Sequence, residues 1–239
     1  MTGKRRALIA GLAATIVLAA LAGQARVFQR VGGIGNTLFR AELVGRSIYE
    51  KIMQINGGEA SVTIAASTRG VAALRDSLAT GGGAIQYKAD DGVGVGRLEG
   101  GGRMASVLAF TPSLANRSIV VAVEQSAAER DRSRDPAQAE GATGIPGLPG
   151  STLTLTLRNG DTRTALESRR TAVAPSVAAA YYDTTLRRSG WTRLLPRAAG
   201  DTGFMLYVKE SEVCCVHVRA GDPRGDCLVT VLRKPGAAQ

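Results

Sequence analysis

The sequence is poor in the residues that most enzymes use for catalysis. Among 239 residues it has one histidine and three cysteines, and aromatic residues make up 4% of the chain. It contains neither a Gly-x-Ser-x-Gly nucleophile elbow nor a phosphate-binding loop that ends in Gly-Lys-Ser or Gly-Lys-Thr. The cysteines lack the paired Cys-x-x-Cys spacing of a closed metal site. These absences predict a protein that is not an enzyme and that holds no metal and no cofactor.

The single histidine is the residue that leaves a catalytic interpretation open. His217 lies between Val216 and Val218 in an alternating stretch that predicts a strand. Cys215 falls on the same face of that strand, so a hydrolase that uses His217 or a cysteine is one alternative. No carboxylate in the sequence is evidently placed to orient the imidazole, which favours a solvent-facing strand residue instead.

The N-terminus has the layout of an export signal. Three cations at residues 4–6 precede an uncharged apolar run over residues 7–23. Residues 1–25 are therefore interpreted as a signal peptide that is cleaved after Ala25, or as an uncleaved membrane anchor. In the second case residues 7–23 contact the membrane. Both interpretations place the rest of the chain in the periplasm or cell envelope.

The chain is basic, with a formal net charge of +10. Residues 1–25 carry three cations and no acid, so their removal leaves a charge of +7. A net positive charge favours binding to anionic partners. A periplasmic binding module for an anionic polymer, either a glycan or DNA, is therefore the alternative function. The scarcity of aromatic residues and the scattered cations argue against a dedicated nucleic-acid role.

All three cysteines, Cys214, Cys215 and Cys227, lie within the last 26 residues. Cysteines that lie close together in an exported protein usually form a disulfide. Adjacent residues of a strand point to opposite faces, so Cys227 can face only one of the other two directly. We expect a structural disulfide from Cys227 to Cys214 or Cys215, with one thiol left over.

Periodicity predicts a first module over residues 36–124. Ile48, Ile52 and Ile55 recur at helical spacing, which predicts a helix that begins near residue 36 and ends near residue 55. A strand, a short helix and three further strands are predicted after it, at residues 60–66, 68–79, 85–98, 104–110 and 118–124.

Residues 125–150 are rich in Ala, Pro, Gly and mixed charges and have almost no apolar periodicity, which predicts a flexible linker. A second module is predicted over residues 151–234. It opens with a hairpin that turns at Asn159-Gly160, and Pro175 then begins a helix that Gly190 ends. Three strands close it, at residues 203–209, 212–219 and 226–233.

The two modules correspond at an offset of about 108 to 110 residues through a helix and three strands, which predicts an internal duplication. The expected fold class is α+β, with two small helix-on-antiparallel-sheet modules after the signal or anchor. The expected function is that of an exported, non-enzymatic envelope protein, an accessory or structural subunit of a secretion, pilus or surface assembly. Its expected partners are envelope or membrane proteins, because exposed strand edges suit strand addition.

Overall fold

The computed structural model describes residues 39–79, 84–90, 92–112, 117–139, 141–194, 202–221 and 226–236. The predicted signal peptide or anchor, residues 1–25, lies outside these ranges. Within them, no helix combines the length and the apolar character that are needed to cross a membrane.

The strands form one 12-stranded antiparallel sheet, in the order β3-β4-β5-β6-β2-β1-β7-β8-β12-β11-β10-β9. The predicted fold class of two helix-on-sheet modules is therefore wrong. Alternation along the sequence identifies single strands, but it does not say which of them pair across a long connection. Here β1 (Arg46–Ile55) pairs with β7 (Thr152–Asn159) at Gln54 and Ile55.

The described helices contribute little to the fold. Three are short: α2 (Ala41–Val44), α3 (Leu74–Ala79) and α4 (Ala127–Arg132). Only α5 (Pro175–Arg188) has more than six residues among the helices that the structure describes. Helices cover only parts of the sheet, so strand pairing supplies most of the architecture.

The stretch predicted as a helix up to Ile55 is mostly the strand β1. Ile48 and Ile52 are four residues apart, a spacing that fits one helix face but is also twice the period of a strand. Side-chain exposure alternates along β1, with every even-numbered residue exposed. The helical interpretation was wrong because pairing in the sheet, which is a long-range effect, decides the conformation.

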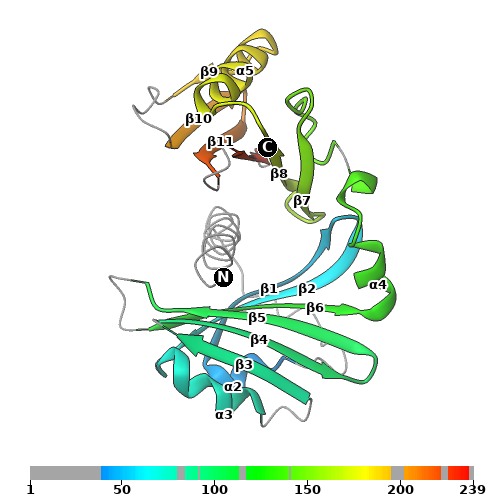
Figure 1. Ribbon diagram of the computed structural model, residues 1–239, viewed down its shortest axis with the longest axis vertical. Helices are drawn as coiled ribbons and strands as arrows, with labels where there is room; N and C mark the ends of the chain where they lie inside the picture. Colours follow the sequence, from blue (N-terminus) through cyan, green and yellow to red (C-terminus); the bar gives the residue numbers. More distant parts are fainter. Residues whose placement is uncertain are drawn as a thin grey trace. The chain divides into compact units, whose positions relative to one another are not determined.

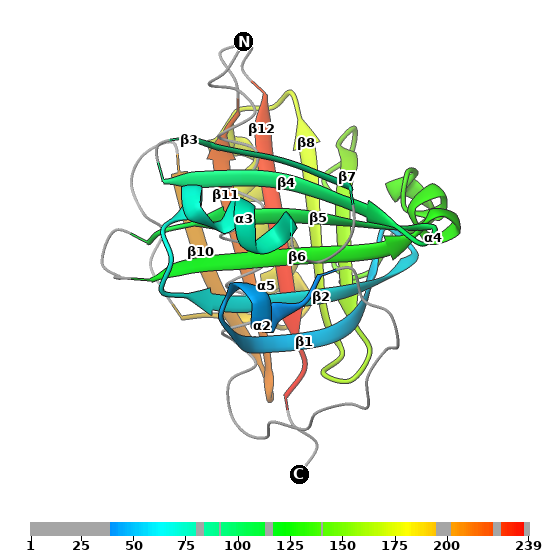
Figure 2. The ribbon, with the colours of Figure 1, turned by 90° about the horizontal axis from the view of Figure 1, so that it is seen from below.

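The chain divides into two compact units, and unit 1 comprises Met1–Met53 and Glu59–Asp131. It contains most of β1 and of β2 (Gly58–Ser67), and the strands β3 (Ala84–Asp90), β4 (Val93–Gly100), β5 (Arg103–Phe110) and β6 (Ser118–Ser126). Figure 2 shows these strands in the order β3, β4, β5, β6, β2 and β1, with α3 and α2 in front of them. Leu74 and Leu78 of α3 pack on small side chains of the sheet, including Ala105 and Ala122.

Two glycines of the Gly-rich run after residue 91 have a packing role. A Cβ atom on Gly94 would overlap the Tyr87 hydroxyl, and one on Gly96 would lie 2.6 Å from the Tyr87 ring. The Tyr87 hydroxyl donates a hydrogen bond of 2.8 Å to the carbonyl oxygen of Val71, in the 3-10 turn η1 (Val71–Ala73). The glycines thus let an aromatic ring lie flat on β4 and fasten the helical segment to the sheet.

Unit 2 comprises Gln54–Gly58 and Arg132–Gln239. Besides β7, it contains the strands β8 (Thr164–Thr171), β9 (Thr192–Arg193), β10 (Thr202–Lys209), β11 (Glu212–Ala220) and β12 (Cys227–Lys234). Helix α5 packs on β10, β11 and β12 (Figure 1). Tyr182, Leu186 and Trp191 are buried there against Tyr207 and Val216.

Residues 125–150, predicted to be a flexible linker, contain α4 and the 3-10 turn η2 (Pro136–Ala139), and their last part packs on unit 2. Ile145 and Leu148 are buried in the core of this unit. The Thr143 amide donates a hydrogen bond of 2.9 Å to the buried carboxylate of Glu167. Buried polar groups and two apolar anchors thus hold a segment whose composition predicts flexibility.

The order of elements recurs in the two units. Unit 1 reads β1-β2-β6-β5-β4-β3 across the sheet and unit 2 reads β7-β8-β12-β11-β10-β9. Strands β4, β5 and β6 begin at residues 93, 103 and 118, and β10, β11 and β12 begin at 202, 212 and 227, each 109 residues later. Whether a duplication produced this recurrence stays a prediction.

Candidate functional site

The structure does not bring the three cysteines together. In the register of β11 and β12, Cys214 lies opposite Arg233 and Cys227 lies opposite Ala220. Six residues of strand separate Cys227 from Arg233, a distance of about 20 Å. A disulfide needs Cα atoms within about 7 Å of each other. All three thiols are free in the structure, and the expected bridge would require a different register.

The thiols are also poor nucleophiles. Burial raises the pKa of Cys214 to about 12, and it raises the pKa of Cys215 and Cys227 as well. The thiolate is the reactive form of cysteine, so all three side chains stay protonated and unreactive near neutral pH.

The described residues directly opposite His217 on the neighbouring strands are not acids. His217 is exposed on β11, and its cross-strand partners are Phe204 and Thr230, neither of which is an acid. Partial burial of the ring and the nearby Arg219 lower the pKa of His217. The imidazole is therefore neutral at pH 7 and has no acid in either cross-strand position to orient it.

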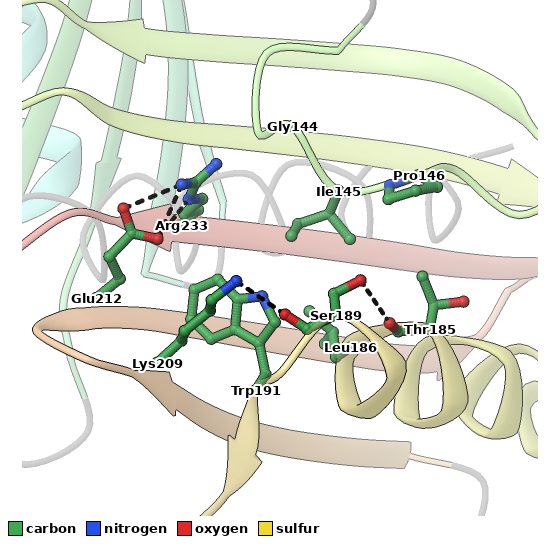
Figure 3. Close-up of a pocket in the computed structure, with 10 residues that line it drawn as sticks. All are labelled: Gly144, Ile145, Pro146, Thr185, Leu186, Ser189, Trp191, Lys209, Glu212 and Arg233. Carbon is green, nitrogen blue, oxygen red and sulfur yellow. Dashed lines mark hydrogen bonds and ion pairs between the residues drawn. The ribbon is translucent and has the colours of Figure 1, made fainter.

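A small pocket in unit 2 lies between the end of α5, the loop near residue 145 and the turn between β10 and β11 (Figure 3). Its volume is about 170 Å³, below the roughly 300 Å³ at which ligand pockets begin. Lys209 donates a hydrogen bond of 2.9 Å to the Ser189 carbonyl oxygen. Arg233 forms a two-pronged ion pair with Glu212, at 2.8 and 3.0 Å, and also donates to the Thr143 carbonyl oxygen at 3.0 Å. These bonds connect the end of α5, the loop near residue 145 and the C-terminal strands. The polar side chains that line the pocket therefore stabilise the packing of these three segments.

A second polar group fastens α5 to the sheet. The Tyr207 hydroxyl donates a hydrogen bond of 2.7 Å to Asp183, and Arg187 and Arg193 each lie 3.3 Å from the same carboxylate. Burial alone would raise the pKa of Asp183, but this hydrogen bond and the two cations outweigh it and hold the pKa below its usual value. Asp183 stays ionised and cannot act as a general acid near neutral pH.

No metal site is found either. Within the described ranges, no three His, Cys, Asp or Glu side chains lie close enough together to hold a metal ion.

Among the described strands, β1 exposes the most large apolar side chains. Ile48 and Ile52 are 38% and 45% exposed, and they point to the same side with the exposed Glu50 between them. Among the described residues, no other helix or strand has two exposed large apolar side chains. On the side away from β2, the described strand pairs of β1 involve only Gln54 and Ile55. We name Ile48, Glu50 and Ile52 the β1 edge.

The opposite edge of unit 1 provides a contrast. Strand β3 is terminal in the sheet order, and its exposed side chains are Ala84, Gln86, Lys88 and Asp90. Charged and polar side chains protect a sheet edge from unwanted strand pairing. Edge β3 is therefore protected, whereas the exposed side of β1 combines Ile48 and Ile52 with Arg46, Glu50 and Gln54.

Comparison of the chain with protein-family models, with curated proteins and with solved structures finds no significant match. The candidate function is therefore argued from the residues alone. Sequence reasoning missed the β1 edge because it assigned Ile48 and Ile52 to the apolar face of a helix. The signal that could have found it is the alternation of Ile48, Glu50 and Ile52 with the intervening residues, which suits a strand as well.

Proposed function

We propose that this chain is an exported, non-enzymatic envelope protein that serves as an accessory or structural subunit of a secretion, pilus or other surface assembly. It binds a partner protein by accepting an extended segment along the β1 edge. The observation that carries this proposal is the exposure of Ile48 and Ile52 on β1, whose described pairs with β7 involve only Gln54 and Ile55.

Strand addition supplies both affinity and selectivity. Main-chain hydrogen bonds to an edge strand give affinity, and pockets for alternate side chains give specificity. Each isoleucine is already more than half buried. Completing its burial stabilises a complex by roughly 1 kcal/mol, because full burial of such a side chain contributes about 1.5 to 3 kcal/mol. The two isoleucines therefore favour an apolar, extended partner segment.

The remaining chemistry of the chain supports binding over catalysis. The thiols are protonated and dispersed, His217 has no acid on the neighbouring strands, and the polar groups of the pocket bond to each other or to the backbone. The expected location is the periplasm or cell envelope, as the layout of residues 1–25 indicates.

The test is quantitative recovery of partners with an epitope-tagged chain, after mild cross-linking in intact cells and membrane fractionation. The wild type is compared with the double variant Ile48→Lys, Ile52→Lys. A matched control is Val95→Lys, since Val95 is similarly exposed, at 42%, but lies on an interior strand. We expect envelope proteins in fixed proportion with the wild type and the control, and loss of at least 90% of them with the double variant. Equal recovery from all three, or recovery from the cytosol, contradicts the proposal.

A further inference from the structure

The pocket of unit 2 is lined by a buried donor that no described residue satisfies. Trp191 lines this pocket and is 6% exposed. A buried tryptophan usually donates its indole N–H to a hydrogen-bond acceptor. Among the described residues, none accepts a hydrogen bond from the indole of Trp191. Figure 3 shows the indole nitrogen on the same side of the ring as Lys209 Nζ and Ser189. A group in the pocket can therefore accept this hydrogen bond.

The neighbouring cation also has donors to spare. Lys209 has three N–H bonds, and one of them donates to the Ser189 carbonyl oxygen at 2.9 Å. Within the described part of the chain, the other two have no acceptor. Lys209 and Arg233 are positively charged and Glu212 is negatively charged, so the charged side chains of the lining leave one positive charge in excess. The pocket thus combines spare donors with a net positive charge.

The acceptors around the pocket are already engaged. Both carboxylate oxygens of Glu212 accept hydrogen bonds from Arg233, at 3.0 and 2.8 Å. The carbonyl oxygen of Thr185 accepts from the amide and the hydroxyl of Ser189, at 3.1 and 2.9 Å. A ligand for this pocket must therefore accept hydrogen bonds and carry negative charge, and a carboxylate does both.

Apolar side chains and a limited volume define the rest of the ligand. Ile145, Pro146 and Leu186 complete this part of the lining, and the volume is about 170 Å³. A cavity of roughly 150 Å³ holds benzene, which has about six non-hydrogen atoms. Butyrate has the same number of non-hydrogen atoms. Water would satisfy the donors but would gain nothing from the apolar side chains.

We propose that the unit 2 pocket binds a short-chain monocarboxylate. Its carboxylate accepts hydrogen bonds from Lys209 and from the indole N–H of Trp191, and its alkyl chain packs against Ile145 and Leu186. All the lining residues belong to unit 2, so this site does not depend on the β1 edge.

The test uses the fact that Trp191 is the only tryptophan of the chain. Its indole N–H gives a single resonance in a proton–nitrogen correlation NMR spectrum, which is followed while the full purified chain is titrated with sodium butyrate. We expect a saturable downfield shift, because the N–H then donates to an anion. Butanol and butylamine, which lack the carboxylate, should cause no saturable shift.

A substitution tests the role of the cation. Lys209→Met removes the charge and keeps an apolar side chain, and it should weaken butyrate binding at least tenfold. The matched control is Lys88→Met on the exposed side of β3, which should bind butyrate as the wild type does. Butyrate binding that is unaffected by Lys209→Met overturns the inference.

A ligand series on the wild type tests the ligand class without any substitution. Butyrate should bind at least tenfold more tightly than octanoate, whose chain exceeds the pocket. It should exceed free alanine by the same factor, because the ammonium group of the amino acid finds the acceptors engaged. No saturable shift with butyrate would mean that water alone occupies the pocket. Equal affinity for free alanine would indicate an amino-acid site, and equal affinity for inorganic phosphate a general anion site; each of these three outcomes overturns the inference.

Discussion

Glu167 helps to order residues 143–147, a segment whose composition predicts flexibility. Its side chain is 2% exposed and accepts a hydrogen bond of 2.9 Å from the Thr143 amide. Arg169, also buried, lies 3.4 Å from the same carboxylate. Tyr181 adds a hydrogen bond of 2.9 Å to the Gly147 carbonyl oxygen. Side chains of β8 and α5 thus supply the partners that the backbone of residues 143–147 needs away from water.

Replacing Glu167 by Gln should destabilise the protein by about 3 kcal/mol, because it leaves Arg169 buried without its counter-ion. Urea denaturation followed by circular dichroism measures this change. The matched control is Glu99→Gln, since Glu99 pairs with Arg97 in the open, where the two side chains are 50% and 48% exposed. The control substitution should lower the free energy of unfolding by less than about 0.5 kcal/mol. Equal effects would show that the Glu167 pair is not buried in solution.

Asp183 predicts a specific pH dependence. Its pKa is lowered in the folded protein, so its contribution to the free energy of unfolding is present above the unfolded-state value of about 3.9 and is lost as the pH falls through the folded-state pKa. Asp183→Asn should therefore destabilise the protein by about 1.5 kcal/mol at pH 7. The difference from the wild type should be smaller at pH 2 than at pH 7. A constant difference at both pH values would contradict the ionised Asp183 described above.

The cysteines predict the result of a thiol count. The register of β11 and β12 keeps Cys214 and Cys227 apart, so the protein unfolded in denaturant without reductant should react with three equivalents of iodoacetamide. Intact-mass analysis distinguishes this result from a single equivalent, which would mean that one disulfide forms and that the strands pair in another register.

At the scale of elements, local patterns predicted most of the strands and the longest described helix. Strands at residues 104–110 and 118–124 match β5 and β6, and the helix begun by Pro175 is α5. These segments have strict alternation, turn residues or a helix start signal. The prediction for β1 was wrong because the four-residue spacing of Ile48 and Ile52 fits the period of a helix and that of a strand. One partner, β2, follows directly after Asn56-Gly57, a two-residue hairpin signal that the helical interpretation did not use.

The Gly-rich run of β4 shows a packing requirement that composition does not reveal. Gly94→Ala should destabilise the protein by about 1 to 3 kcal/mol, since the added methyl group forces Tyr87 from its place. Gly70→Ala is the control, because no atom lies within 4 Å of its Cβ position. Thermal unfolding compares the two variants. A neutral Gly94→Ala would contradict the packing of Tyr87 on β4.

At the scale of the whole molecule, the sequence predicted the succession of elements better than their assembly. The offset of about 108 to 110 residues is close to the observed 109 between corresponding strands, yet the strands belong to one sheet order instead of two. The pairing of Gln54 with Arg158 and of Ile55 with Leu157 joins residues 104 and 102 apart in the sequence, and alternation carries no information about such pairs. The candidate surface was missed for the same reason, because Ile48 and Ile52 become exposed neighbours of an edge only once β1 is a strand.

The central claim is that a partner segment pairs with β1. Its most direct test replaces Glu50 by a photo-crosslinking amino acid in the full chain, with the same replacement at Lys88 on the protected edge β3 as control. After irradiation of intact cells, peptide mass spectrometry should identify one extended segment of an envelope protein linked to residue 50 and none to residue 88. Equal labelling at both positions, or labelling at residue 88 alone, would contradict the assignment of the β1 edge as the protein-binding surface.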